Sequence, residues 1–196
     1  MRARAEPFFP EPFLLDKWRV GFMRRANLLG DRRFLDLHRH VTNMQEMFRE
    51  AVSFNQPLNK WNVSNVIFMA CMFDGARSFN QPLNNWNVSN VRDMGGMFAN
   101  AEAFNQPLNN WNVSNVMDMR WMFEVARSFN QPLNNWNVSK VTNMEAMFWG
   151  ATSFNQPLNN WNVSKVTYMY DMFEEATSFN QPLHAPWYAV EQSDSE

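Results

Sequence analysis

Apolar residues recur along this chain with a fixed period of 25 residues. Phenylalanine and methionine positions keep this step, and so do the tryptophans at Trp61, Trp86, Trp111, Trp136 and Trp161. A period between 20 and 50 residues is typical of stacked-repeat proteins, in which no repeat can bury its apolar face alone. The pattern therefore predicts a solenoid whose core contains these five tryptophans.

The second half of each repeat has the spacing of a short amphipathic helix. In residues 66–76, apolar side chains fall at Val66, Met69, Met72, Phe73 and Ala76. Steps of three and four residues place such side chains on one helix face. A helix of about three turns is marginal by itself, so packing has to hold it. This half occurs six times, beginning at residue 41.

The first half of each repeat has the spacing of a short strand. Leu58, Trp61 and Val63 follow the L-x-x-L-x-L pattern of leucine-rich repeats. Strands from successive coils would then pair in parallel. The predicted fold class is an α/β repeat solenoid, leucine-rich-repeat-like, with one short parallel strand and one short helix in each 25-residue coil. Five copies of the strand half are expected, ending near Leu183.

Charge and composition divide the chain into three parts. Residues 1–40 hold nine Lys or Arg and five Asp or Glu, and are expected to form a basic N-terminal cap or helical segment. Such a segment can be a solvated cap, or it can dock to its own repeats or to an anionic partner. Residues 41–183 form the predicted solenoid, and residues 184–196 a polar C-terminal tail. Trp187 is expected beyond the array, so its truncation should cost little stability.

The repeated asparagines admit two interpretations. Stacked at one place in each coil, they can form a ladder that satisfies backbone groups at tight bends. Alternatively, outward rows of amides can form a polar lattice for a periodic ligand such as a polysaccharide. The ladder or lattice candidates are Asn59, Asn84, Asn85, Asn109, Asn110, Asn134, Asn135, Asn159 and Asn160.

Side chains between the apolar anchors of the helix half differ freely from copy to copy. Free variation indicates positions that face outward, and aromatic residues at a surface are favoured interface anchors. Neutral variation on a solvated face is the competing interpretation. The candidate partner-binding residues are Phe68, Trp121, Trp149, Tyr168 and Tyr170.

Nothing in the sequence predicts an enzyme. The single cysteine, Cys71, occupies a variable position, His38 and His40 have no third ligand nearby, and the carboxylates are scattered. No catalytic residue, metal site or cofactor is therefore predicted. Clustered Lys and Arg of a nucleic-acid module are absent from the repeats. No apolar run reaches the length of a membrane span, and no signal peptide is visible.

The repeat "FNQPLNNWNVSNV" followed by "MxxMF" closely resembles that of BspA-like leucine-rich repeat surface proteins, a repeat catalogued as a domain of unknown function. The resemblance covers about residues 41–183; further upstream, Asp36 stands where tryptophan is expected and Arg39 where serine is expected. It implies a right-handed leucine-rich-repeat-like solenoid, display at the cell surface or secretion, and binding to host or extracellular partners without catalysis. The compartment stays open because no signal peptide is visible.

Two functions follow from these patterns. The first is a non-catalytic interaction solenoid that recognises an unknown macromolecule through its variable residues or its concave strand row. The alternative is a structural or carbohydrate-binding array that uses the repeated asparagine rows.

Overall fold

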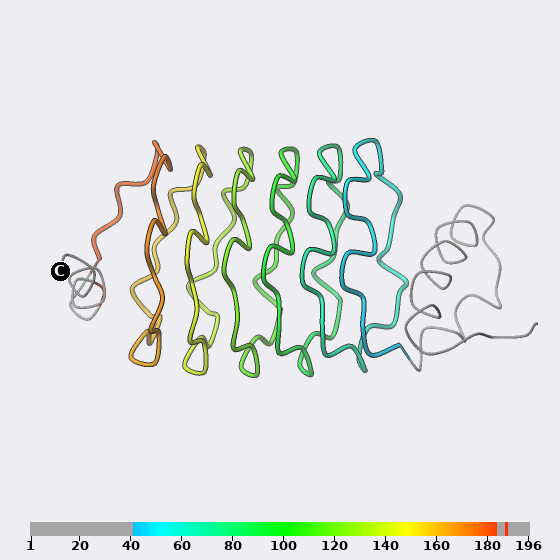
Figure 1. Cartoon of the computed structure of the whole chain (residues 1–196), viewed down its shortest axis with the longest axis horizontal. Coiled ribbons are helices and arrows are strands. Elements are labelled where there is room, and N and C mark those ends of the chain that lie inside the picture. Colours follow the sequence, from blue (N-terminus) through cyan, green and yellow to red (C-terminus); the bar gives the residue numbers. More distant parts are fainter. Residues whose placement is uncertain (1–40, 184–186, 188–196) are drawn as a thin grey trace, which may run out of the picture.

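The computed structural model describes residues 41–183 and Trp187. These residues wind into successive coils, one for each 25-residue repeat, which stand side by side along the long axis (Figure 1). The expected N-terminal cap, residues 1–40, lies outside the described residues, as does most of the expected tail.

Regular secondary structure within residues 41–183 is limited to single-residue parallel bridges between neighbouring coils. The bridges pair Asn43 with Phe68, Phe68 with Asp93, Asp93 with Asp118, Asp118 with Asn143, and Asn143 with Tyr168. This column runs through the half of the repeat for which a helix was expected. Residues 70–75 form turns, and residues 58–63, for which a strand was expected, carry no bridge. Trp187 has helical backbone.

Backbone hydrogen bonds explain why the bridged half of each repeat is not helical. Every second amide donates to a carbonyl of the next coil instead of to its own coil. In the first coil these donors are Met44, Glu46, Phe48 and Glu50, and their acceptors are Phe68, Ala70, Met72 and Asp74, at 2.6–3.0 Å. The amides between them close tight turns, as Met47 does on the Met44 carbonyl. The backbone groups of this half are thus satisfied between coils, where a helix would satisfy them internally.

Each described coil contains two residues in the left-handed backbone region. All have φ between 47° and 69°: Glu46, Glu50, Cys71, Gly75, Gly96, Asn100, Trp121, Val125, Ala146, Gly150, Asp171 and Glu175. These residues are third in turns such as 44–47 and 48–51, the place where a type II turn requires positive φ. Only three of the twelve are glycine, so the fold imposes this conformation on ordinary side chains.

Val125→Asn should raise the free energy of unfolding by about 1 kcal/mol, because a β-branched residue is strained at positive φ. Val125 has φ 52°, whereas the equivalent residue one coil earlier, Asn100, has φ 54° and a side chain that tolerates it. Urea unfolding measures the change. Val52→Asn, at an exposed position outside the left-handed set, serves as the control and should change little. A loss of stability on Val125→Asn would contradict the strain.

The core consists of aromatic columns that run along the axis. One column contains Phe48, Phe73, Phe98, Phe123, Phe148 and Phe173, with neighbouring ring centres 5.4–5.7 Å apart. A second begins at Phe54 and ends at Phe179, with steps of 5.8–6.1 Å. The five repeated tryptophans are 2–5% exposed, and the rings of Trp111, Trp136 and Trp161 stack at 6.4 Å. Stacked aromatic pairs add to the stabilisation that burial supplies.

Hydrogen bonds tie the tryptophan column to the backbone. The indole Nε1 of Trp86 donates to the Leu58 carbonyl at 3.0 Å, and that of Trp111 donates to the Leu83 carbonyl at the same distance. Trp136 and Trp161 repeat the contact one and two coils later. Each ring is therefore held to the preceding coil by packing and by a directional bond.

Trp187 extends this column, contrary to the expectation that it lies beyond the array. It is 4% exposed, and its ring lies 6.2 Å from that of Trp161 and 6.3 Å from that of Phe173. Trp187 follows Trp161 by 26 residues, so the 25-residue period did not reveal it. Because Trp187 is buried, the expectation that its truncation would cost little stability no longer holds.

Candidate interaction surface

Many of the residues that vary between repeats lie on the bridged side of the solenoid. We define the turn face as the outward side chains of residues 43–50, 68–75, 93–100, 118–125, 143–150 and 168–175. Inward residues of the same segments are the methionines and phenylalanines of the core, such as Met72 and Phe73. The turn face thus combines an invariant interior with a surface that differs from coil to coil.

Four of the five predicted aromatic residues are prominent on the turn face. Phe68, Trp121, Tyr168 and Tyr170 are 37–50% exposed. Trp149 is half-buried, and its Nε1 donates to the Glu174 carboxylate at 3.2 Å. Large apolar side chains that stay exposed in this way are available to a partner.

The five aromatics do not form one cluster. Tyr168 and Tyr170 meet edge to face, with ring centres 6.0 Å apart. Phe68 and Tyr168 belong to the same bridge column, but three coils separate them within it. The turn face therefore offers several aromatic contacts spread along the axis.

Arg120 is a turn-face residue that sequence reasoning did not select. Its guanidinium lies 5.3 Å from the centre of the Trp121 ring, and its Nε is 3.1 Å from the Asp118 carboxylate. Stacking and ion pairing hold the side chain in place. The sequence feature that could have identified Arg120 is its position next to Trp121 in the variable part of the fourth copy.

Charge separates the turn face from the rest of the described chain. The turn face carries ten carboxylates and two arginines, a net charge of −8. The other described residues carry six Lys or Arg and one Glu, a net charge of +5. The carboxylates are Glu46, Glu50, Asp74, Asp93, Asp118, Glu124, Glu145, Asp171, Glu174 and Glu175. A surface of one sign attracts partners of the other sign.

Burial shifts three titratable groups on this face. Partial burial raises the pKa of the Asp118 carboxyl, although the Arg120 amide and guanidinium oppose the rise. Burial raises the pKa of Glu124, and the charge of Asp74 adds to it. Burial also raises the pKa of the Cys71 thiol, which disfavours the reactive thiolate. Among the described residues, no three His, Cys, Asp or Glu side chains are grouped to hold a metal ion.

A ladder of asparagines runs along a different line of the solenoid. The Asn55 side-chain oxygen accepts hydrogen bonds from the Asn80 amide at 2.9 Å and from Gln81 Nε2 at 3.1 Å. Asn80, Asn105, Asn130 and Asn155 repeat the contact toward the next coil. The oxygens of this line stabilise the turns and are not presented to a ligand.

The candidate asparagines of the neighbouring rows differ in their contacts. The side-chain oxygens of Asn84 and Asn134 accept the amides of Asn110 and Asn160, at 3.1 Å and 2.9 Å. Asn109 Nδ2 donates to the Asn110 side chain at 3.4 Å. The exposed members of these rows are Asn59, Asn85, Asn109, Asn110, Asn135, Asn159 and Asn160. They form the polar lattice of the alternative function.

Comparison with known proteins places the repeats in one family. Residues 35–131 and 107–195 both match the family described as "Mycoplasma protein of unknown function, DUF285". The chain belongs to this family. Two tandem matches agree with the coil repetition seen in the structure. No match was found among curated proteins or among solved structures.

In the part of the chain that the structure describes, no helix is long and apolar enough to cross a membrane.

Proposed function

We propose that this DUF285 protein is a non-catalytic interaction solenoid that recognises another protein through its turn face. The observation that carries the proposal is the combination of exposed aromatics, a stacked Arg120–Trp121 pair and a charge of −8 on a surface whose residues vary between coils. Aromatic and arginine side chains are the residue types that most often dominate binding energy. The charge favours a partner with a basic surface.

The fold class and the finer family also belong to this proposal. We class the stack as a leucine-rich-repeat-like α/β solenoid of the BspA-like type, with the helical half reduced to turns. The repeat sequence and the parallel bridges support this class. Cell-surface display or secretion would follow from it, with host or extracellular proteins as partners.

Trp121→Ala combined with Tyr168→Ala should weaken partner binding at least about tenfold, since each removes an exposed aromatic anchor. The full chain, biotinylated and immobilised, is exposed to proteins from candidate partner cells, and each captured protein is then titrated by surface plasmon resonance. Val52→Ala is the control, because Val52 is an exposed apolar residue outside the turn face. Equal affinities for the double variant and the wild type would contradict the proposal.

A carbohydrate-type lattice binder is the second candidate function. It is favoured by exposed amides that recur at one place in successive coils, at Asn85, Asn110, Asn135 and Asn160. The first coil has Lys60 at this place, next to the exposed amide of Asn59. A glycan array probed with the full chain tests it. Replacing Asn85, Asn110 and Asn135 by alanine should abolish the glycan signal, whereas the aromatic double variant should retain it. Absence of any glycan signal would count against this candidate.

A further inference from the structure

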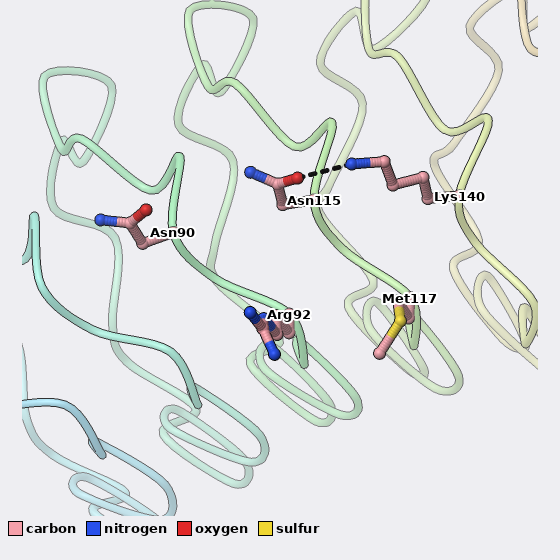
Figure 2. A pocket seen from close by; sticks show the side chains of 5 residues that line it. All are labelled: Asn90, Arg92, Asn115, Met117 and Lys140. Carbon is pink, nitrogen blue, oxygen red and sulfur yellow. Dashed lines mark hydrogen bonds between the residues drawn. The ribbon is translucent and has the colours of Figure 1, made fainter.

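A shallow groove lies outside the turn face, across three neighbouring coils. Its volume is about 270 Å³, and its lining consists of Asn90, Arg92, Asn115, Met117 and Lys140 (Figure 2). Asn90, Asn115 and Lys140 occupy equivalent places in successive coils, as do Arg92 and Met117. The groove therefore follows the axis of the solenoid, between two rows of side chains.

The polar groups of the groove are held by the coils beneath them. Asn90 Nδ2 donates to the Ser64 carbonyl at 2.7 Å, and Asn115 Nδ2 donates to the Ser89 carbonyl at 2.8 Å. Lys140 Nζ in turn donates to the Asn115 side-chain oxygen at 2.7 Å (Figure 2). The bonds to the Ser64 and Ser89 carbonyls orient the two amides before any ligand arrives, which lowers the entropy cost of binding.

The groove keeps unused capacity for negative charge. Two cations and no carboxylate line it. Arg92 forms no ion pair with any described residue. Lys140 has three donors, of which the bond to Asn115 takes one. A ligand with two separated carboxylates matches this arrangement, and Arg92 can bind one of them in bidentate fashion.

Nearby carboxylates do not fill this capacity, because they serve their own turns. Asp93 follows Arg92 in sequence, but its Oδ1 accepts the Gly95 amide at 2.9 Å. The Oδ1 of Asp118 accepts the Arg120 amide at 3.0 Å, and its Oδ2 pairs with the Arg120 guanidinium. Asp93 and Asp118 belong to the turn face, so the groove stays positively charged beside the negatively charged turn face.

The spacing of the groove fits an extended peptide. Equivalent core rings of successive coils lie 5.4–6.4 Å apart, and at the groove the Met117 amide donates to the Arg92 carbonyl of the preceding coil at 2.9 Å. Alternate residues of an extended chain advance by about 6.6 Å and point to the same side. Met117, which is 49% exposed, lies one coil beyond Arg92 and offers an adaptable apolar contact. Lys140 belongs to the following coil, and its amine reaches back to Asn115 in the coil of Met117. No aromatic ring lines the groove for a sugar to stack on.

We propose that this groove binds an extended acidic peptide segment of a partner protein, with acidic, apolar and acidic side chains at alternate positions. The first carboxylate binds Arg92, the apolar side chain packs on Met117, and the second carboxylate binds Lys140. This site is separate from the turn face of the proposed function. It selects an acidic ligand, whereas the turn face favours a basic one.

Fluorescence anisotropy with the full chain tests the site. The probe is a labelled peptide with the core Glu-Ser-Leu-Ser-Glu, compared with a Gln-Ser-Leu-Ser-Gln peptide and with a peptide in which two serines separate each pair. We expect the glutamine peptide to bind at least about tenfold more weakly, because both charge-assisted bonds are lost. The wider spacing should also weaken binding, and rising salt should weaken binding of the first peptide.

Matched charge variants separate the groove from the overall charge. Arg92→Glu with Lys140→Glu should abolish binding, whereas Lys60→Glu with Arg127→Glu, the same change in net charge at exposed sites elsewhere, should retain it. Met117→Thr, the residue of the following coil, should weaken binding several-fold. The turn-face double variant Trp121→Ala/Tyr168→Ala should leave peptide binding unchanged. The peptide assay therefore tests the groove independently of whether the turn face binds a partner.

Three results would overturn the peptide site. The first is an equal loss of binding in the groove variant and the charge-matched control. The second is tighter binding of a sulfated oligosaccharide than of the peptide, with the same dependence on Arg92 and Lys140. The third is self-association in sedimentation velocity that Arg92→Glu abolishes, since a second copy of the chain would then be the occupant.

Discussion

Trp111→Ala is expected to lower the free energy of unfolding by about 3–5 kcal/mol, the range measured for truncating large buried aromatic residues. Trp111 lies in a middle coil, is 3% exposed, and stacks on Trp136. Alanine would leave a cavity between two coils and would also leave the Leu83 carbonyl without its indole donor. Equilibrium urea unfolding, followed by far-ultraviolet circular dichroism, measures the loss.

Trp121→Ala provides the control for this experiment, because the same substitution is made at a turn-face position that is 38% exposed. Its effect on stability should stay below about 1 kcal/mol, since a surface truncation leaves no cavity. Equal shifts for the two variants would show that the tryptophan column does not hold the coils together.

Asn105→Leu should lower the free energy of unfolding by about 2 kcal/mol, because it leaves partly buried donors without an acceptor. The Asn105 side-chain oxygen accepts the Asn130 amide at 3.0 Å and Gln131 Nε2 at 2.9 Å. Urea unfolding gives the loss, and faster hydrogen exchange at the Asn130 amide locates it in the ladder.

Two further variants make the ladder prediction specific. Asn105→Asp keeps an acceptor oxygen in place and should recover most of the stability. Asn109→Leu changes an exposed asparagine whose own oxygen accepts no hydrogen bond from the described residues, and should cost less than about 0.5 kcal/mol. A similar loss at positions 105 and 109 would mean that solvent exposure of leucine, and not the ladder, determines the effect.

The sequence was most informative about which side chains turn inward. A tryptophan every 25 residues can be buried repeatedly only if successive repeats stack, and the periodicity of Phe54 and Met72 carries the same information. Free variation at Phe68 and Trp121 similarly indicated exposed positions, and both side chains are exposed in the structure.

The course of the backbone was harder to predict. The spacing of Val66, Met69, Met72 and Phe73 is typical of a helix face, yet a chain of tight turns brings the same residues inward. The difference lies in whether amides bond within a coil or to the next coil, and side-chain spacing carries no information on that choice. Left-handed residues were equally hidden, because most of the positions hold residues other than glycine.

Features that combine residues from different repeats also escaped prediction. The groove brings together Arg92, Met117 and Lys140 from three coils, and each looks like ordinary variation within its own copy. Its recognition requires the axial register of the coils. Trp187 was missed for a related reason, since a one-residue departure from the period hides it from pattern matching.

The left-handed residues have a consequence for engineering this scaffold. A combinatorial library aimed at new specificities would do best to diversify positions such as 68, 70 and 74 without restriction. At positions such as 71 and 75, where φ is positive, the codons should be limited to glycine, asparagine and aspartate. A randomised β-branched residue there would reduce the yield of folded clones before any selection for affinity began.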